Sequence, residues 1–341
     1  MNNTINKPIF SVVMPMYNVA KYVATAIESV LAQTYGQFEL ICVDDGCTDN
    51  TLDIVSTYKD SRIRVIRQKN MGLSAARNTG ISHARGLYVA LLDSDDYWAP
   101  TKLQMHLSHF RNNPKLGVSY SASQFIDEEG NLLGIGQYPK LTNIHAQDIF
   151  CRNPIGNGSA AVLRKSMLLQ MGKHVYNNGE VRLTYFDERL RQSEDVEFWL
   201  RAALTSDWQF MGIGEGLTFY RVNASGLSAN LTNQFQAWRV SVKNNYHLNP
   251  AFFDKWYSMA SAYQKRYLAR RAVQSRNSFT ALKFSVGAIL TNWRIMRDEP
   301  SRTLATLGAA LLSILPSSIY NALEQRAMQF TKAVQQRSLP V

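Results

Sequence analysis

Short apolar runs alternate with helically spaced apolar residues along the first hundred positions of the chain. Such runs suit buried strands, because a parallel sheet covered on both faces requires no alternation of apolar and polar residues. The intervening helical spacing predicts amphipathic helices, and this order of elements favours a parallel sheet with right-handed crossovers. The predicted strands are residues 10–14, 38–43, 63–66 and 89–92; helices are predicted over 19–33 and 72–84 and after a cap at Thr48 or Asp49.

The pattern is less regular after residue 100 and becomes helical after residue 230. We therefore predict an α/β domain over residues 1–230 and a separate helical region, rich in aromatic residues and arginine, over residues 231–341. The middle of the chain is predicted to form a helix over 103–110, strands over 116–123, 159–163, 210–213 and 217–220, a turn at 127–131 and a loop over the Gly-, Asn- and Pro-rich residues 134–160.

Charge separates the same two regions. The chain has 341 residues, 45% of them hydrophobic, and a formal net charge of +11. Residues 231–341 hold 15 Lys and Arg but 4 Asp and Glu, whereas residues 1–230 hold 22 of each sign. This asymmetry predicts a neutral working domain and a basic region that meets an anionic partner.

Three cysteines, Cys42, Cys47 and Cys151, have neither the spacing of a metal site nor the number of a disulfide framework. They favour a reducing compartment. The polar residues 1–8 lack the apolar core of a signal peptide, and the longest apolar run, residues 304–315, is too short to span a membrane. We therefore expect a cytoplasmic protein.

Acidic residues follow two of the predicted strands directly. Asp44 and Asp45 follow residues 38–43, and Asp93, Asp95 and Asp96 follow residues 89–92. One such strand end would more often be a solvated turn, but two at the same sheet edge would repel each other unless a cation or donors offset the charge. Mg²⁺-type ions bind one or two carboxylates together with substrate phosphates, so a metal and phosphate site is predicted.

Two helix starts add candidate chemistry. Arg77 lies in the early turns of the helix predicted over 72–84, where the helix dipole and a guanidinium both favour anions. Glu194 and Asp195 lie in the first turn of a helix that Ser193 is predicted to cap. Taken alone, a surface arginine and acids that complement a helix dipole would explain these residues equally well.

Together, these motifs resemble family 2 glycosyltransferases in order and spacing. The resemblance implies the GT-A fold, a Rossmann-like, mostly parallel central sheet flanked by helices, and covers about residues 8–228. The C-terminal region matches no family pattern. The motifs are SVVMPMYN at residues 11–18, VDDGCTD at 43–49, the segment 72–80 that ends in ARNTG, LDSDD at 92–96, and the Glu-Asp pair at 194–195.

The resemblance assigns a role to each matching residue. It implies that Asp45, with its neighbour Asp44, reads the nucleotide base and that Arg77 lies near the diphosphate. Asp93 and Asp95 match the Asp-x-Asp motif that holds Mn²⁺ or Mg²⁺, with Asp93 near the ribose and Asp95 on the metal, and Asp195 matches the catalytic base. The residues expected to bind substrate are Pro15, Met16, Tyr17, Asn18, Asp44, Asp45, Arg77, Asp93, Ser94 and Glu194.

The chain departs from the family pattern at two positions. Cys47 stands where the Asp-Asp-Gly motif usually continues with Ser, which we interpret as a local packing change. Asn223 stands where a His often follows the Tyr-Arg pair, so no histidine ligand to the metal or phosphate is expected there.

The resemblance implies an inverting, metal-dependent transfer of a sugar from a nucleotide-sugar donor, with UDP expected as the nucleotide. The expected acceptor is a hydroxyl of a glycan or polyprenyl-linked molecule in cell-surface polysaccharide synthesis. Residues 231–341 are expected either to make peripheral contact with the anionic inner face of the cytoplasmic membrane or to pack on the catalytic domain or form a homo-oligomer.

Other classes of function fit the sequence less well. A nucleic-acid-binding protein would explain the basic region but not the acids at two strand ends of a neutral domain, so we expect no nucleic acid. A sugar-nucleotide pyrophosphorylase or a dinucleotide oxidoreductase would require a Gly-rich motif after the first strand, where residues 15–18 read PMYN. A nucleotide-sugar-binding protein without transferase activity remains an alternative that Asp195 can test.

Overall fold

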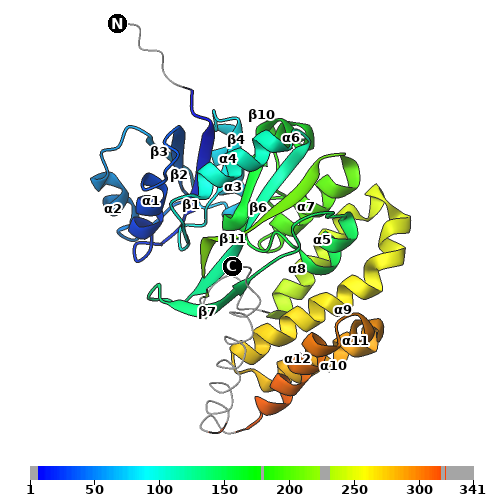
Figure 1. The fold of residues 1–341 in the computed structure, drawn as a ribbon. Helices are drawn as coiled ribbons and strands as arrows, with labels where there is room; N and C mark the ends of the chain where they lie inside the picture. The colour runs from blue at the N-terminus through cyan, green and yellow to red at the C-terminus, as the bar shows by residue number, and fades with distance from the viewer. Residues whose placement is uncertain (1–6, 178–179, 223–230, 316–318, 320–341) are drawn as a thin grey trace, which may run out of the picture. The chain divides into compact units, whose positions relative to one another are not determined.

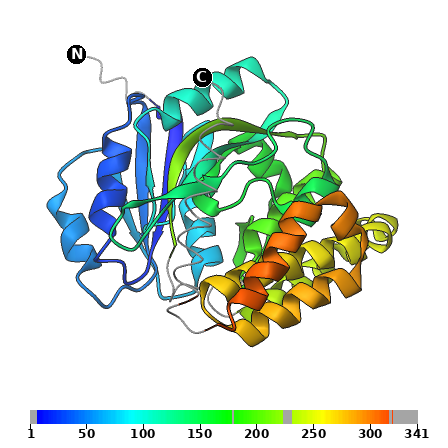
Figure 2. The ribbon, with the colours of Figure 1, turned by 60° about the horizontal axis from the view of Figure 1, so that its bottom comes forward.

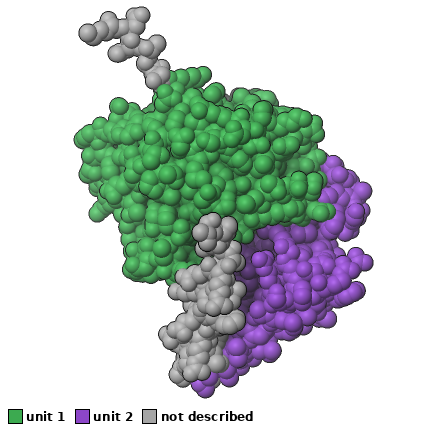
Figure 3. Space-filling view, viewed as in Figure 1, with its two compact units in different colours: residues 1–149, 153–222 green, residues 150–152, 223–341 purple. Residues whose placement is uncertain are grey.

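The computed structural model describes residues 7–177, 180–222, 231–315 and 319 (Figure 1). The chain divides into two compact units, which Figure 3 colours separately. The described part of unit 1 holds the β-strands, whereas the described part of unit 2 is helical. Unit 1 consists of Met1–Ile149 and Asn153–Val222, and unit 2 of Phe150–Arg152 and Asn223–Val341.

Parallel strands form the first half of the main sheet, in the order β3-β2-β1-β4. The sequence predicted these strands from their apolar runs, and the prediction is confirmed. β1 and β2 are buried along their whole length, as expected for central strands covered on both faces. The strands are β1 (Phe10–Met16), β2 (Phe38–Asp44), β3 (Ile63–Arg67) and β4 (Tyr88–Leu91).

Right-handed crossovers place α1 and α2 on one face of these strands and α3 on the other (Figure 2). Gly80 allows α3 to approach β1 closely, because a Cβ atom there would lie 2.3 Å from Cγ1 of Val13. This close packing fixes α3, which carries Arg77, against the sheet. The helices are α1 (Val23–Leu31), α2 (Thr51–Thr57) and α3 (Leu73–Ser82).

The second half of the main sheet is mixed. β8 runs antiparallel to both β4 and β6, and β11 runs parallel to β6. β5 and β7 extend the sheet as antiparallel partners of β11 and β6. The additional elements of unit 1 are β5 (Tyr97–Trp98), β6 (Leu116–Ile126), β7 (Leu132–Gln137), β8 (Ala161–Arg164), β11 (Gln209–Arg221), α4 (Lys102–Asn112), α6 (Lys165–Met171) and α7 (Glu194–Thr205).

Two predictions about unit 1 after residue 130 are wrong, and one hairpin outside the main sheet was missed. The two strands predicted over 210–213 and 217–220 are one strand, β11, with register shifts between Ile213 and Thr218. The predicted loop over 134–160 contains the end of β7, α5 (Ala146–Arg152) and the 3-10 helix η1 (Gly158–Ala160). The hairpin of β9 (Lys173–Asn177) and β10 (Glu180–Thr184) was not predicted.

Unit 2 builds its own core from helices and stacked aromatic rings. The indole of Trp238 stacks on the rings of Phe150, Phe235 and Tyr257. Several aromatic residues of the basic region, Trp238 among them, are therefore core residues of unit 2. No described helix is long and apolar enough to cross a membrane. The elements are α8 (Leu231–Asn245), η3 (Tyr246–Leu248), α9 (Pro250–Gln274), α10 (Ser278–Thr291), α11 (Arg294–Asp298) and α12 (Pro300–Leu312).

Candidate active site

The ends of β1 and β2 lie side by side at the carboxyl edge of the parallel strands. Met16 pairs with Asp44 in the strand register, and the backbone N–H of Asp45 donates to the carbonyl of Met16 over 2.9 Å. Ligands of open α/β sheets bind outside this edge. Pro15 and Met16 are buried, whereas Tyr17, which directly follows β1, is 51% exposed.

Asp45 holds the loop that leads into α3. Its buried carboxylate accepts hydrogen bonds from the backbone N–H groups of Met71 at 2.9 Å and Gly72 at 2.8 Å, and from the side chain of Gln68 at 2.7 Å. Gly72 has a φ of 91°, a conformation that favours glycine. In this structure, Asp45 therefore fixes the shape of the loop that leads into α3.

Asp44 and Asn18 organise the loop that follows β2. The carboxylate of Asp44 accepts from the backbone N–H groups of Gly46 and Cys47, at 3.1 and 2.8 Å. The side-chain carbonyl of Asn18 accepts from the backbone N–H of Thr48 at 2.8 Å. The Cys47 side chain packs against the hydrophobic core, and burial raises the pKa of its thiol to about 11, which fits the packing role expected for this position.

Arg77 joins two acidic motifs. Its guanidinium is 2% exposed and donates from Nη2 to Asp93 and from Nη1 to Glu194, both over 2.6 Å. Burial alone would lower the guanidinium pKa, but the two carboxylates raise it above its ordinary value. Both terminal nitrogens of the Arg77 guanidinium therefore contact carboxylates of the protein itself. The geometry favours a positioning role for it.

A glycine makes room for this ion pair. A Cβ atom on Gly158, in η1, would lie 2.3 Å from Nη2 of Arg77 and 3.0 Å from Oδ2 of Asp93. The neighbouring Ser159 hydroxyl accepts from the backbone N–H of Asp93 at 2.9 Å and donates to Asp96 at 2.6 Å. The η1 turn therefore holds Asp93 and Asp96 in place after β4.

The acids after β4 have different surroundings. Asp93 and Asp95 are half-buried, whereas Asp96 is buried and accepts from Ser159 and from the backbone N–H of Arg221. Burial and the neighbouring Asp93 raise the pKa of Asp95 to about 6. Burial and the other two acids raise the pKa of Asp96 well above its ordinary value. The arrangement leaves Asp93 and Asp95 as candidate metal ligands and makes Asp96 a structural residue, while Ser94 is buried between them.

The donor chemistry of this strand end fits a divalent cation. Asp93 and Asp95 supply carboxylate oxygens, the ligands that Mg²⁺ and Mn²⁺ accept, and their mutual repulsion would be relieved by a cation. Among the described residues, no group of three or more His, Cys, Asp and Glu could form a complete cage. Two carboxylates fit the type of site in which substrate phosphates complete the coordination.

Glu194 and Asp195 begin α7. Glu194 is buried against Arg77, and Asp195 is half-buried beside it. Burial, with the charge of Glu194, raises the pKa of Asp195 to about 7, although Arg77 acts in the opposite direction. Ser193 occupies the capping position with a φ of 62°, but its hydroxyl caps none of the described backbone groups of α7, so that prediction is wrong.

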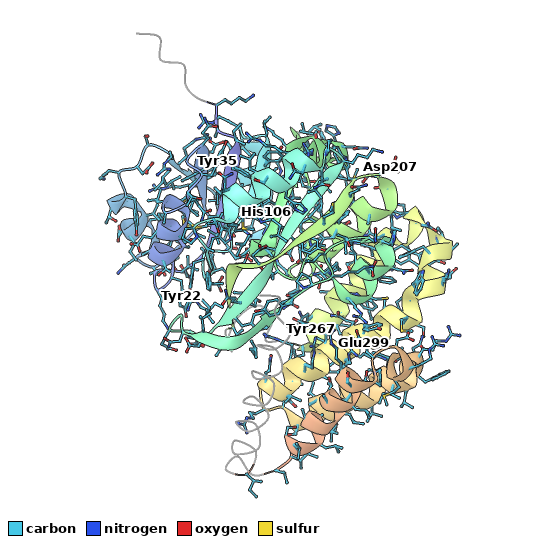
Figure 4. The ribbon with its side chains drawn as sticks, viewed as in Figure 1. Tyr22, Tyr35, His106, Asp207, Tyr267 and Glu299 are labelled. Atoms are coloured by element: carbon cyan, nitrogen blue, oxygen red, sulfur yellow. The ribbon has the colours of Figure 1, made fainter. Side chains whose placement is uncertain are left out.

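Two residues that support the site, Ser159 and Arg221, were not predicted from the sequence. Ser159 gave no signal, since a serine in a predicted strand has no evident chemistry. Arg221 ends β11 and donates from Nε to the backbone carbonyl of Asp95 at 2.8 Å, while its guanidinium lies 4.4 Å from the ring centre of Tyr22 (labelled in Figure 4). The Tyr-Arg pair at 220–221 was its only signal. Asn223, two positions on, lies outside the described residues.

Comparisons with known proteins identify the family. The model of Glycosyl transferase family 2 matches residues 11–172. The uncharacterized glycosyltransferase EpsJ of Bacillus subtilis is 30% identical over 310 residues, which cover 83% of this chain and 84% of EpsJ. The Escherichia coli UDP-Glc:alpha-D-GlcNAc-diphosphoundecaprenol beta-1,3-glucosyltransferase WfaP is 31% identical over 65% of this chain and 80% of WfaP.

Solved structures identify the fold. S. aureus TarS in complex with UDP-GlcNAc has a TM-score of 0.58 at 19% identity, over 90% of this chain and 81% of that one. The mannosyltransferase PcManGT of Pyrobaculum calidifontis, in complex with GDP-Man and Mn²⁺, has a TM-score of 0.57 at 18% identity, over 90% and 86% of the two chains. The chain thus has the GT-A fold that its sequence predicted, and it belongs to glycosyltransferase family 2.

Proposed function

We propose that this chain is an inverting, metal-dependent transferase that moves a sugar from a nucleotide-sugar donor to a hydroxyl of a lipid-linked or glycan acceptor in cell-surface polysaccharide synthesis. The observation that carries the proposal is the Arg77 guanidinium, which holds Asp93 and Glu194 together. Through Arg77, the candidate metal ligand Asp93 lies close to the Glu194-Asp195 pair, which contains the expected base.

The relatives support the choice of substrates. The name of WfaP describes transfer from UDP-glucose to a diphosphoundecaprenol-linked sugar, and TarS was solved with UDP-GlcNAc. PcManGT was solved with GDP-Man and Mn²⁺, so a GDP-sugar is the natural second donor to test. We propose a UDP-sugar donor and an acceptor linked to a polyprenyl diphosphate.

We assign donor binding to the carboxyl edge of β1, β2 and β4. The exposed ring of Tyr17 and the loop held by Asp45 would receive the nucleoside. Asp93 and Asp95 would hold Mn²⁺ or Mg²⁺, which when bound supplies a Lewis acid for the charge on the departing diphosphate. Asp96 and Arg221 would keep this strand end in place.

We assign the role of base to Asp195. Its pKa of about 7 lets a substantial fraction be ionised at neutral pH while keeping it basic enough to accept a proton. The acceptor oxygen attacks the anomeric carbon, its proton passes to the Asp195 carboxylate, and the bond from the anomeric carbon to the diphosphate oxygen breaks. Direct displacement of this kind inverts the anomeric centre.

We also propose that residues 1–230 form the catalytic domain and that the basic helices of residues 231–341 bring it to an anionic membrane face. Because a polyprenyl-linked acceptor is embedded in the membrane, this contact would bring the catalytic domain to its acceptor. The surplus of basic residues in this region supports the assignment.

A donor panel tests the proposal. The full chain is incubated with UDP-glucose, UDP-GlcNAc and GDP-mannose, with Mn²⁺ or with a chelator, and release of the nucleoside diphosphate is measured. We expect Mn²⁺-dependent release from one donor class and its loss in Asp195→Asn. Donor binding with no release from the wild type, even with polyprenyl-linked acceptors added, would instead support a binding protein without transferase activity.

A further inference from the structure

The helix α10 is apolar on two opposite sides. Ala281, Phe284 and Ala288 are buried in unit 2, where α10 packs against α9 and α12. On the other side, Phe279 is 79% and Leu290 81% exposed. A helix with apolar residues all round is normally buried, so the exposed side calls for a partner.

The exposed residues form one stripe. Helical spacing places Phe279, Lys283, Val286 and Leu290 on the same side of α10, and we call these residues the α10 stripe. An exposed tryptophan, Trp293, follows directly after the helix. Exposed aromatic and aliphatic side chains accompanied by basic residues are typical of protein segments that lie in a membrane interface.

The charges around the stripe are mostly positive. From Ser278 to Leu312, the exposed charged residues are Lys283, Arg294, Arg297, Asp298 and Arg302, whereas Glu299 is buried against Arg266 (Glu299 is labelled in Figure 4). A second copy of the chain would bring the same positive charges, which would repel one another. Residues 320–341 carry Arg326, Lys332 and Arg337 against Glu324, so they add no complementary charge either. An anionic surface is the complementary partner.

The length of α10 decides how it could meet a bilayer. Its 14 residues measure about 21 Å at about 1.5 Å per residue. A hydrocarbon core of about 30 Å is thicker than this. The helix would therefore lie in the plane of the interface, with the apolar side chains of the α10 stripe among the acyl chains and Lys283 and the other basic residues at the headgroups.

We propose that the α10 stripe is a docking surface for an anionic lipid bilayer. The inference deepens the proposed action on a lipid-linked acceptor and rests on that function for its biological purpose. Vesicle binding can be measured without donor or acceptor, so its failure and the failure of the transfer reaction can be told apart.

Vesicle flotation of the full chain tests the proposal. We expect binding to phosphatidylcholine vesicles that contain phosphatidylglycerol, weakened by high salt. The double variant Phe279→Ser/Leu290→Ser should bind about tenfold or more weakly, since it removes the two most exposed apolar side chains. The matched control is Leu87→Ser/Leu132→Ser, because these residues of unit 1 are 54% and 57% exposed, and it should bind like the wild type.

A charge variant and three further measurements complete the test. Lys283→Gln/Arg294→Gln should lose the preference for phosphatidylglycerol. All variants should keep the wild-type melting temperature and rate of nucleoside diphosphate release. The proposal is overturned if the wild type binds neither vesicle, if the stripe variant binds as well as its control, or if the stripe variant converts a dimer to a monomer in gel filtration, which would make a second copy the occupant.

Discussion

The guanidinium of Arg77 lies 2.6 Å from the carboxylate of Asp93, and both side chains sit at the carboxyl edge of the parallel strands. The same guanidinium binds Glu194, which is 117 residues away in sequence. One buried cation therefore fixes the relative positions of the candidate metal ligand and of the helix start that carries the candidate base. Several measurable consequences depend on this pair.

Removing the Arg77 side chain should destabilise the protein strongly. Arg77→Met leaves two acids at the site without their shared cation, and breaking a buried pair costs about 3–5 kcal/mol. Urea unfolding measures this loss. The control is Arg189→Met, whose partner is Asp187 but whose side chain is 80% exposed, so it should cost about 1 kcal/mol or less. Equal losses in the two variants would contradict the central role of Arg77.

Replacing the proposed base should remove catalysis but not donor binding. Asp195→Asn keeps the shape of the side chain and should lower the transfer rate by about 10²–10⁴-fold, the usual contribution of a general base. Calorimetry should give an unchanged donor affinity. Glu215→Gln, an exposed acid of β11, is the control and should keep full activity. A rate within a few-fold of wild type would rule Asp195 out as the base.

The pH dependence should report the same group. Burial and Glu194 raise the pKa of Asp195 from 3.8 to about 7 in the folded chain. The folded chain thus holds this proton more tightly than the unfolded chain, so the ionisation of Asp195 lowers stability as the pH rises from about 4 to about 7. Because that ionisation also creates the base, transfer should rise with pH up to neutrality.

Two measurements check this sign. The pH-rate profile of nucleoside diphosphate release should have an ascending limb with its midpoint near the pKa of Asp195, and the residual rate of Asp195→Asn should lack it. The melting temperature of Asp195→Asn relative to wild type should be higher at about pH 8 than at about pH 5. If the difference in melting temperature between Asp195→Asn and wild type did not change with pH, the pKa of Asp195 would not be raised in the folded chain.

Two neighbouring acids should respond to substitution in different ways. Asp95→Asn removes a proposed ligand, so it should raise the Mn²⁺ concentration needed for half-maximal activity with little change in stability. Asp96→Asn disturbs the hydrogen bonds from Ser159 and Arg221 and should cost about 1–3 kcal/mol of stability. Parallel Mn²⁺ titrations and urea unfolding separate the effects. Identical profiles for the two variants would refute the division of roles.

A single added methyl group should disturb the ion pair. Gly158→Ala places a Cβ atom 2.3 Å from the Arg77 guanidinium, so we expect a lower turnover number in a chain that still unfolds cooperatively. Gly36→Ala is the control, since a Cβ atom there meets no described atom within 4 Å. Wild-type turnover in Gly158→Ala would show that the pair tolerates displacement.

The parallel half of the sheet could be predicted because its signal is local. Its strands are short, mainly apolar segments, and the acids lie at the end of β2 or shortly after β4 in the sequence. β11 was harder, because Gly214 and Gly216 interrupt the apolar pattern while the backbone continues through bulges. The start of α5 did leave a signal, since the carboxylate of Asp148 accepts from the backbone N–H of His145, a spacing typical of a helix start.

The candidate site was predictable by motif but not by contact. The residue types of Arg77, Asp93 and Glu194 pointed to anion and metal chemistry. That one guanidinium would bind both acids depends on the packing of α3 and α7, which no local pattern specifies. The support from Ser159 likewise arises only when η1 and β4 come together in space.

The helix α5 begins with residues of unit 1, but Phe150, Cys151 and Arg152 belong to unit 2, where Phe150 packs against Trp238 and Phe253. The two units are therefore not consecutive segments of the chain. A truncation after Val222 would keep Phe150 and discard the rings that cover it. Recombination at that boundary would be penalised for the same reason, so we expect the two units to be inherited together rather than exchanged as cassettes among related transferases.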